Sequence, residues 1–414
     1  MHEFKYKNNK LYCERVLVSE LVKKYGTPLY VYSYNTFIGH YLKLKKAFAQ
    51  VNPLICYSVK ANSNLAILKA LVAKGAGLDI VSGGELFRAL KAGCKAGNIV
   101  YASVGKTNNE IEEAIRKGIL FFNVESLPEL ENINQIAGRL GKKTSVAIRI
   151  NPDVAPKTHH FITTGKLTNK FGIDFVTAEN ILLLASKFSH VNIRGIHIHI
   201  GSQITVGAPF VEAIKKVIVF INKLKAKGIN IEYLNIGGGL GIIYQNEKPQ
   251  TADEFARKVL PLLKSSGLKI IMEPGRFIIG SAAILAVKVL YIKKNPLKNF
   301  VIVDGGMNDL IRPSLYDAHH EIVLLTAKQP GKTIKVDVVG PICESSDFFA
   351  KARNLPKVKE GDYIAVMCTG AYGFSMASNY NSRRRPAEIL VKGDQAKVIR
   401  KREKLEDLIR NEIA

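Results

Sequence analysis

Several features that would place a chain in a specialised class are missing here. The 414 residues contain no tryptophan, and the five cysteines are scattered without any CxxC pair. An odd number of scattered cysteines favours reduced thiols in the cytoplasm over a disulfide framework. No apolar run reaches the roughly 18 residues that a membrane-spanning helix needs. Residues 1–5 also lack the apolar segment of a secretory signal. We therefore expect a cytoplasmic protein with no membrane partner.

Acidic residues are scarce relative to basic ones. Asp and Glu together number 35 against 60 Lys and Arg, so the formal net charge is +25. Most lysines lie on amphipathic helical patterns, as in residues 212–225, which is typical of solvated helix faces. Zinc-finger spacing, an RNP-type aromatic motif and a basic low-complexity tail are all absent from the sequence. We expect no nucleic-acid partner, although such a charge would attract anions.

Strand-like and helix-like segments alternate through the first two thirds of the chain. Eight strand candidates are separated by helical stretches, which predicts an α/β fold, a parallel (β/α)₈ TIM barrel. A doubly wound sheet usually has fewer strands and opens on a GxGxxG turn, which is missing here. The expected strands are residues 54–59, 78–81, 99–103, 120–124, 145–150, 195–200, 233–236 and 269–272.

The rhythm changes after residue 279. Short β-rich runs separated by Gly, Pro and Asn follow, and the next long helical pattern is the charged stretch 400–413. This predicts an all-β, antiparallel domain over residues 279–414. Residues 1–28 look more like this domain than like the barrel. We expect them to complete it, with the barrel of residues 29–278 inserted between its two parts.

One lysine stands where an expected strand ends. The apolar residues 54–59 lead into Lys60 and a small polar turn, and ligands of α/β proteins bind at such ends. An amine at the mouth of an apolar strand is partly desolvated, which lowers its pKa and makes it nucleophilic. A Schiff base with an aldehyde cofactor requires such an amine. A lysine that only reaches past the strand to water is the plainer interpretation of this segment taken alone.

The other strand ends carry polar groups that would meet at one end of a barrel. The loop Gly237-Gly238-Gly239 lacks the lysine and the Ser or Thr of a P-loop, so a single phosphate fits it better than a triphosphate. Ser202 would add a hydroxyl donor. The strand-end residues are Asp79, Ser82, Arg149, His199, Ser202, Gly237, Gly238, Gly239, Glu273 and Arg276.

Two histidines and one glutamate have competing interpretations. His197 and His199 alternate along one expected strand and face the same side, but no third ligand stands at zinc-site spacing, so we expect no metal. We interpret His197 as a core histidine and His199 as a ring able to stack on a flat cofactor. Glu273 facing a pyridine nitrogen would keep that nitrogen protonated. A structural pair between Glu273 and Arg276 is the alternative.

The β domain contributes three polar segments, residues 312–316, 343–347 and 370–373. Cys343 stands in a turn next to acidic residues, which raise the pKa of a thiol. It therefore suits a proton donor better than a thiolate nucleophile. We interpret the other four cysteines as buried structural residues.

Nine segments together resemble the fold-type III pyridoxal-phosphate decarboxylases, and within them the diaminopimelate decarboxylases. Any one segment could arise by chance, but their order and number could not. The resemblance covers about residues 29–390. The segments are YSVKAN (57–62), LDIVSGGEL (78–86), HHFITTGKLTNKFGI (159–173), GIHIHIGSQI (195–204), NIGGGLG (235–241), EPGRF (273–277), VDGGMNDLIRPSLYDAHH (303–320), GPICESSD (340–347) and CTGAYGFSMASNYNSR (368–383).

The resemblance implies an alanine-racemase-like barrel enzyme that uses pyridoxal 5'-phosphate to convert meso-2,6-diaminopimelate to L-lysine and carbon dioxide, the last step of lysine biosynthesis. Lys60 would hold the cofactor as a Schiff base, His199 would stack on its ring, and Glu273 would pair with the ring nitrogen. The resemblance implies that the other cofactor contacts come from Asp79, Ser202, Gly237, Gly238, Gly239, Gly275, Arg276 and Tyr372.

The same resemblance implies how the substrate is held. Arg276, Arg312 and Tyr316 would bind its distal carboxylate and Glu344 its distal ammonium, with Tyr372 near both phosphate and substrate. Cys343 would return a proton to the carbanion. In this family the Cys343–Glu344 loop and Tyr372 reach the barrel across a subunit interface. We therefore expect a homodimer with shared sites, or a larger even assembly such as a tetramer.

Departures from the family pattern are few. Ala282-Ala283 replaces an alanine–glycine pair, and Arg384 stands where relatives often have proline. Residues 163–170 have the position of a lid. A decarboxylase of ornithine, arginine or carboxynorspermidine is the nearest alternative, but a distal amine alone needs no arginine. An alanine racemase would carry a catalytic tyrosine in place of Cys343, and a non-catalytic pyridoxal-phosphate-binding module would lack the β domain.

Overall fold

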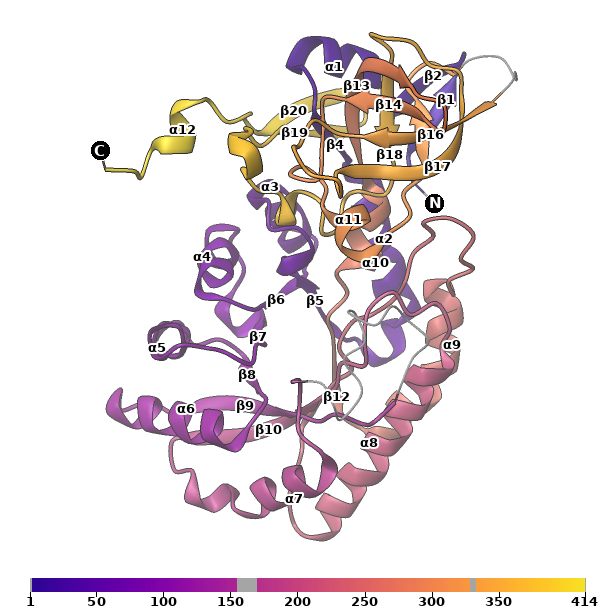
Figure 1. Ribbon diagram of the computed structural model, residues 1–414. Coiled ribbons are helices and arrows are strands. Elements are labelled where there is room, and N and C mark those ends of the chain that lie inside the picture. Colours follow the sequence, from indigo (N-terminus) through magenta and orange to yellow (C-terminus); the bar gives the residue numbers. More distant parts are fainter. Residues whose placement is uncertain (1, 155–169, 328–332, 414) are drawn as a thin grey trace. The chain divides into compact units, whose positions relative to one another are not determined.

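Figure 1 shows a computed structural model of the protein, which describes residues 2–154, 170–327 and 333–413. The chain forms two compact units. The barrel unit comprises His40–Ile242 and Lys248–Phe277, and the β unit comprises Met1–Gly39, Ile243–Glu247 and Ile278–Ala414. The predicted lid, apart from Lys170, lies outside the described residues.

Eight strands close the barrel in the order β10-β11-β12-β5-β6-β7-β8-β9, and every neighbouring pair is parallel. The TIM barrel expected from the sequence is therefore confirmed. The strands are β5 Leu54–Ser58, β6 Gly77–Ile80, β7 Ile99–Tyr101, β8 Phe121–Val124, β9 Thr144–Arg149, β10 Val191–His197, β11 Tyr233–Asn235 and β12 Lys269–Met272.

Helices follow the strands and lie outside them (Figure 1). Their first turns are set by local sequence. Thr107 and Thr251 each accept a hydrogen bond from the backbone of a glutamate three residues on, and that glutamate bonds back to the threonine N–H. Such capping boxes satisfy N–H groups that have no partner inside the helix. The helices are α3 Leu65–Val72, α4 Gly83–Lys91, α5 Asn108–Lys117, α6 Leu127–Arg139, α7 Phe175–Leu183, α8 Ala208–Ala226 and α9 Ala252–Ser266.

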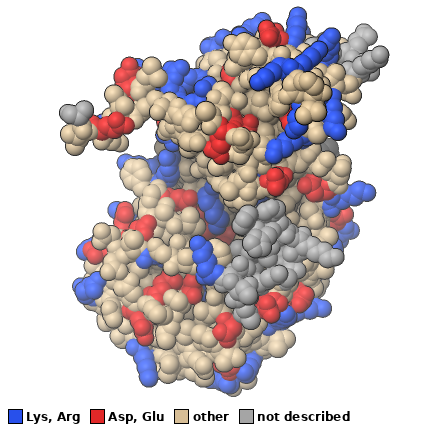
Figure 2. All heavy atoms as spheres, viewed as in Figure 1, with Lys and Arg blue, Asp and Glu red and all other residues tan. Residues whose placement is uncertain are grey.

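The lysines of α8 show where much of the positive charge lies. Lys215, Lys216 and Lys223 are exposed, whereas Ile214 and Val217 on the opposite face are buried. On the face drawn in Figure 2, Lys and Arg side chains are distributed over the surface with Asp and Glu among them. For α8 the expectation of a solvated basic helix face is confirmed. No helix in the described part of the chain is both long enough and apolar enough to cross a membrane.

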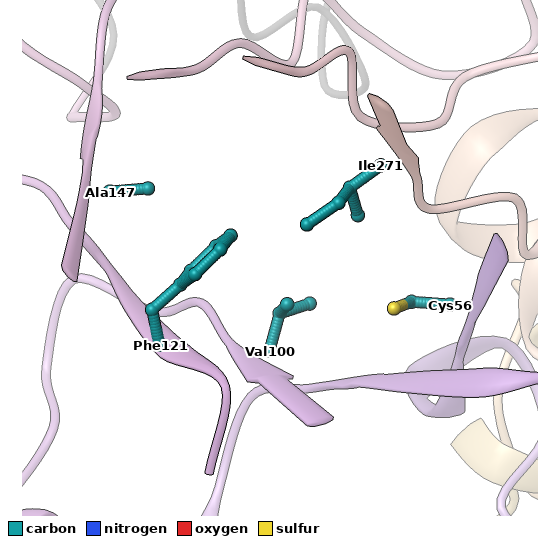
Figure 3. Packing of buried hydrophobic residues seen from close by; sticks show 5 residues of the cluster. All are labelled: Cys56, Val100, Phe121, Ala147 and Ile271. Carbon is teal, nitrogen blue, oxygen red and sulfur yellow. The ribbon is translucent and has the colours of Figure 1, made fainter. Parts of the chain in front are cut away.

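Apolar side chains fill the centre of the barrel. Phe121 points into the middle, surrounded by Cys56, Val100, Ala147 and Ile271, and none of the five is more than 1% exposed (Figure 3). Alternate residues of a strand face the same side. The polar residues that stand two positions beyond Cys56 and Ile271 therefore continue the inner face at the carboxyl ends of their strands. This apolar layer lies directly beneath the polar residues at the carboxyl end of the barrel.

The β unit is built on a nine-stranded sheet with the main order β17-β16-β14-β13-β4-β19-β20, while β18 pairs with β13 and β15. A separate three-stranded sheet holds β1, β2 and β3. The strands are β1 Phe4–Lys7, β2 Lys10–Cys13, β3 Val16–Leu17, β4 Leu29–Ser33, β13 Ala283–Lys294, β14 Asn299–Val303, β15 Ile322–Leu324, β16 Thr333–Val339, β17 Phe348–Pro356, β18 Tyr363–Val366, β19 Ala387–Lys392 and β20 Gln395–Arg400.

Five further α-helices complete the described structure. Four of them have at most eight residues, and α2 has 14. They are α1 Val18–Tyr25, α2 Tyr34–Ala47, α10 Arg276–Ile279, α11 Arg312–Tyr316 and α12 Glu406–Ile409. The N-terminal residues do join the β unit, through β4, which pairs with β13 and β19. The β unit extends to Gly39, and the predicted boundary at residue 28 lies one residue before the start of β4.

Two details of the β unit differ from the sequence expectation. The sheet is mixed, because β14 pairs with β16 and β4 pairs with β19 in parallel. These pairings join strands far apart in the chain and leave no local pattern. The predicted helix over residues 400–413 is also wrong. Arg400 ends strand β20, and the helical part of this stretch is the four-residue α12.

Candidate active site

Lys60 lies directly beyond strand β5, in the short 3₁₀ turn Val59–Ala61. Its Nζ atom is 3.2 Å from Oδ2 of Asp79, which lies in strand β6 and is fully buried. The Ser58 hydroxyl donates to the same oxygen over 2.7 Å. The Lys60 side chain is 37% exposed, so the amine is partly desolvated, as expected from the sequence. The structure places a primary amine at the open end of the barrel, directed by a buried carboxylate.

Asp79 is in an unusual electrostatic position. Burial raises the pKa of its carboxyl above the usual value, the charge of Glu273 raises it further, and Lys60 acts in the opposite direction. Its Oδ1 atom is buried and has no hydrogen-bond partner among the described residues. A buried oxygen of this kind can accept one further donor.

Glu273 follows strand β12 and is held by three side chains from three other strands. Asn123 and Asn235 donate to Oε1 over 3.0 and 2.6 Å, and Nε2 of His197 lies 3.2 Å from Oε2. Burial alone would raise the pKa of Glu273, but His197, Lys60 and the Asn235 amide together lower it below the usual value. These partners keep the carboxylate charged inside the barrel.

The alternative pairing of Glu273 with Arg276 is therefore wrong: in the described chain the carboxylate contacts two amides and an imidazole. Arg276 instead donates to the Ser202 hydroxyl, through Nη2 over 3.1 Å. Next to it, a Cβ atom at Gly275 would stand 3.0 and 3.1 Å from the Cβ atoms of Ser58 and Ala61. Glycine is needed there because the turn passes so close to the residues around Lys60.

His199 lies just past the end of strand β10. Its Nδ1 atom accepts the Gly238 N–H over 3.3 Å. Burial, together with the positive charges of Arg149 and Lys60, holds the pKa of His199 well below the usual value. The ring is therefore neutral near pH 7, as the acceptor role of Nδ1 also requires. A flat neutral ring beside the glycine loop suits stacking on an aromatic cofactor.

The glycine loop lets three backbone segments approach closely. A Cβ atom at Gly238 would lie 2.1 Å from the Glu273 carbonyl oxygen, and Gly237 and Gly239 have φ angles of 67° and 105°. The N–H groups of Gly237 and Gly238 already donate to Asn235 Oδ1 and His199 Nδ1. The first role of these glycines is thus close packing of the loop, with the Ser202–Arg276 pair as the nearby donor set for an anion.

Three residues around Glu273 were missed by sequence reasoning. Asn123 and Asn235 received no role, and His197 was interpreted as a core histidine. Asn123 and Asn235 lie near the carboxyl ends of predicted strands, and His197 lies inside one, and each is a polar residue that interrupts an apolar run. That position was the available signal.

A buried ion-pair network supports this end of the barrel. Lys106 donates to Glu129 over 2.6 Å and to the Asn123 carbonyl over 2.9 Å, and its side chain is fully buried. Arg149, predicted as a strand-end residue, pairs with buried Glu125 over 2.7 Å. Breaking such a pair would leave a buried charge without compensation. The network holds Asn123 and Arg149 in fixed positions.

In the β unit, Arg312 begins helix α11 and is buried. Its Nη1 atom donates to Nε2 of His320 over 2.9 Å, and Nδ1 of His320 in turn donates to the Met367 carbonyl. The guanidinium also lies 4.6 Å from the centre of the Tyr244 ring. A planar cation held this way is already oriented for a carboxylate. Tyr316, at the other end of α11, is partly exposed.

Cys343 and Glu344 lie in an exposed turn of the β unit. The Cys343 N–H donates to Asn381 over 2.8 Å, and Glu344 accepts from the Ser346 hydroxyl, which lowers the pKa of Glu344. The other four cysteines are buried, as expected. Tyr372 is partly exposed and has a φ angle of 58°, a strained value for a residue with a side chain.

Comparison with known proteins agrees with this geometry. Residues 35–280 match the pyridoxal-binding domain of the pyridoxal-dependent decarboxylases. The diaminopimelate decarboxylase of Aquifex aeolicus is 49% identical over 98% of this chain and 96% of its own length. The chain belongs to the diaminopimelate decarboxylases. The enzyme from Haemophilus influenzae is 47% identical over 99% of this chain and 98% of its own length.

Solved structures of diaminopimelate decarboxylases have the same fold over the whole chain. That from Helicobacter pylori, complexed with L-lysine, matches with a TM-score of 0.91 and 46% identity, over 95% of this chain and 98% of its own. That from M. jannaschii in co-complex with L-lysine matches with a TM-score of 0.95 and 39% identity, over 100% and 99%. These matches favour a diaminopimelate decarboxylase over the racemase and the non-catalytic binding module.

The barrel residues fit pyridoxal phosphate, the cofactor of the diaminopimelate decarboxylases. Lys60 supplies a primary amine, His199 a neutral flat ring, and Glu273 a charged carboxylate of the kind a protonated pyridine requires. The Ser202–Arg276 pair supplies donors for a phosphate, and buried Oδ1 of Asp79 still has acceptor capacity. The predicted cofactor, family and fold are thus confirmed, whereas the individual residue roles remain predictions.

Proposed function

We propose that this chain decarboxylates meso-2,6-diaminopimelate to L-lysine in the cytoplasm, with the reaction at the carboxyl end of the barrel. The observation that carries the proposal is the arrangement at that end: a primary amine beside a buried carboxylate, and a second carboxylate kept charged by three donors. Pyridoxal phosphate, when bound, supplies an electron sink for the electron pair left by departing carbon dioxide.

The barrel residues bind and orient the cofactor. Lys60 would hold it, with Asp79 keeping the amine in place, and Glu273 would keep a proton on the ring nitrogen because a buried carboxylate stabilises the adjacent positive charge. His199 stacks against the ring. Ser202, Arg276, Gly275 and Tyr372 would hold the phosphate, together with the part of the Gly237–Gly239 backbone that is not already bonded to Asn235 and His199.

Recognition of the substrate requires fixed charges for a second amino-acid head group. Arg312 is oriented by His320 and by Tyr244 before substrate arrives, so its fork can grip a carboxylate at little conformational cost. Arg276 and Tyr316 assist it, and Glu344 binds the distal ammonium. A substrate with a distal amine alone offers no carboxylate to Arg312.

Cys343 delivers the proton that replaces carbon dioxide. It is the exposed thiol among the five cysteines, and it lies in the same turn as Glu344. We propose that this turn and Tyr372 act on the barrel of a second subunit, in a homodimer or a tetramer.

The central test is a lysine substitution. Lys60→Ala should give a colourless protein that releases no carbon dioxide, whereas the matched control Lys69→Ala, at an exposed position of α3, should keep both colour and activity. Borohydride reduction of the wild-type protein should abolish the visible absorbance and leave the cofactor on the peptide containing Lys60. A fully active Lys60→Ala variant would end the proposal.

A second test concerns the substrate. Carbon dioxide release should be measured from meso-diaminopimelate, ornithine and arginine with the same holoenzyme. We expect diaminopimelate to be used with by far the highest kcat/KM, because it alone carries the distal carboxylate. Faster turnover of ornithine would refute the substrate while leaving the fold and the cofactor unchanged.

A further inference from the structure

His197 is placed differently from a histidine that only fills the core. It ends strand β10 opposite Arg149 of β9 and Asn235 of β11, and 1% of it is exposed. Its Nε2 atom lies 3.2 Å from Oε2 of Glu273. Because a charged carboxylate can only accept, the proton must sit on Nε2.

The second observation concerns the other ring nitrogen of His197, Nδ1. Nδ1 of His197 is buried and lacks a hydrogen-bond partner among the described residues. Buried polar groups are almost always satisfied, so a histidine that leaves one nitrogen unpaired calls for an explanation. The described part of the chain gives this ring one side-chain hydrogen bond, and that bond goes to Glu273.

The two carboxylate oxygens of Glu273 accept different numbers of side-chain hydrogen bonds from the described residues. Oε1 accepts from both Asn123 and Asn235, which uses its two lone-pair directions. Among the described residues, Oε2 accepts from His197 alone. One lone pair of Oε2 therefore stays available for a ring N–H. The oxygen able to receive that proton is the one that His197 touches.

We propose that His197 is a positioning residue for the decarboxylation, acting on the bound cofactor only through Oε2 of Glu273, which it orients and keeps charged. The inference rests on the proposed pairing of Glu273 with the ring nitrogen. Without the imidazole, Oε2 would be a buried anionic oxygen with no donor from the described residues. The carboxylate would then rotate or bind a proton, and the ring nitrogen would lose its proton more easily.

Two amide substitutions separate hydrogen bonding from packing. His197→Gln keeps an N–H donor at nearly the position of Nε2, whereas His197→Asn is one methylene shorter and cannot reach Oε2. We expect the Asn variant to lose roughly ten- to a hundredfold in kcat, the range for a hydrogen bond to a charged group. KM should change little because His197 is buried in the barrel, and Gln should restore most of kcat.

The decisive readout is the protonation of the cofactor rather than activity. Apoenzyme reconstituted with pyridoxal phosphate carrying ¹⁵N in the ring should show a protonated nitrogen by NMR in wild type and in His197→Gln. In His197→Asn the nitrogen shift should move towards the unprotonated value. An unchanged shift in the Asn variant would overturn the proposal, as would a Gln variant no better than Asn. If the Asn variant fails to unfold cooperatively, His197→Phe replaces it, because the ring keeps the packing and loses the donor.

A double-mutant cycle separates this inference from the function on which it rests. Adding His197→Asn to Glu273→Gln should cause no further loss, because His197 acts only through that carboxylate. Independent, multiplicative losses would refute the positioning role. If Glu273→Gln itself kept wild-type kcat and a protonated ring nitrogen, the proposed role of Glu273 would fail first, and the inference would fall with it.

Discussion

Single residues in this protein owe their chemistry to burial and to one or two partners. Arg312 and Glu273 are both buried charges, yet each is compensated differently. The arginine is held by an imidazole and an aromatic ring, and the carboxylate by two amides and an imidazole. Neutral hydrogen-bond and ring partners fix the orientation of a buried charge.

Cysteine reactivity gives a prediction at this scale. Iodoacetamide should modify Cys343 in the folded protein much faster than the other four cysteines, because those four are buried. Modification should abolish carbon dioxide release while the visible absorbance of the bound cofactor remains. Peptide mass spectrometry would locate the label. The Cys343→Ala variant should take up almost no iodoacetamide and should release carbon dioxide slowly. Wild-type activity in this variant would contradict the proton-donor role.

Two short segments of the β unit are joined by one carboxylate. Oδ1 of Asp347 accepts the Met307 N–H and Oδ2 accepts the Ile342 N–H, both over 2.6 Å. The first donor lies in the loop that leads into α11 and the second lies next to Cys343. Asp347 therefore ties the loop bearing the proton donor to the segment that positions Arg312.

We expect Asp347→Ala to free both backbone N–H groups and to loosen both segments, at a cost of about 2–4 kcal/mol in unfolding free energy. Hydrogen exchange followed by mass spectrometry should show faster exchange in peptides covering residues 305–310 and 340–347. The matched control is Ser345→Ala in the same turn, where the side chain is exposed. Unchanged exchange in the Asp347 variant would show that the turn is held by other contacts.

The turn before α11 should also make stability depend on pH. Burial raises the pKa of Asp309 from 3.8 to about 7, although the Gly306 N–H donates to its carboxyl. Between these values the folded chain keeps a proton that the unfolded chain has released. The contribution of protonated Asp309 to folding stability is therefore complete below about pH 4 and is lost as pH rises through about 7. Its full size is on the order of a few kcal/mol.

Asp309→Asn cannot ionise, so its unfolding free energy should change less between pH 5 and pH 8 than that of wild type. The amide can be accommodated, because buried Oδ1 of the neighbouring Asn308 has no partner among the described residues and can accept from it after a half-turn of the Asn308 side chain. Urea unfolding at the two pH values is the measurement. An equal change in unfolding free energy between the two pH values in both proteins would exclude Asp309 as the source of the pH dependence.

At the scale of the whole molecule, we propose that two subunits share each active site. Mixing Lys60→Ala subunits, inactive alone, with Cys343→Ala subunits, strongly slowed alone, should then restore about a quarter of wild-type activity. Half of the randomly formed dimers carry one intact site out of two. Activity should appear only after the subunits are allowed to exchange. No recovery in verified mixed dimers would show that each site is complete within one chain.

Prediction from sequence succeeded where the signal was local. Alternating strands and helices gave the barrel, and the strand ends gave Lys60, Asp79 and Glu273. It failed where pairing joined distant segments, as with the parallel partners of β4 and β14. The stretch 400–413 has helical composition, yet its first residue pairs in β20, because sheet contacts outweigh weak helix propensity.

The sequence by itself determined which chemical groups stand at the strand ends, because side-chain alternation and turn residues are read within a few positions. Tertiary structure decided how those groups are paired. Asn123, His197 and Asn235 come from three strands, and only closure of the barrel brings them onto the two oxygens of Glu273. The charge of that carboxylate depends on burial and on partners up to 150 residues away in the chain, which no local pattern contains.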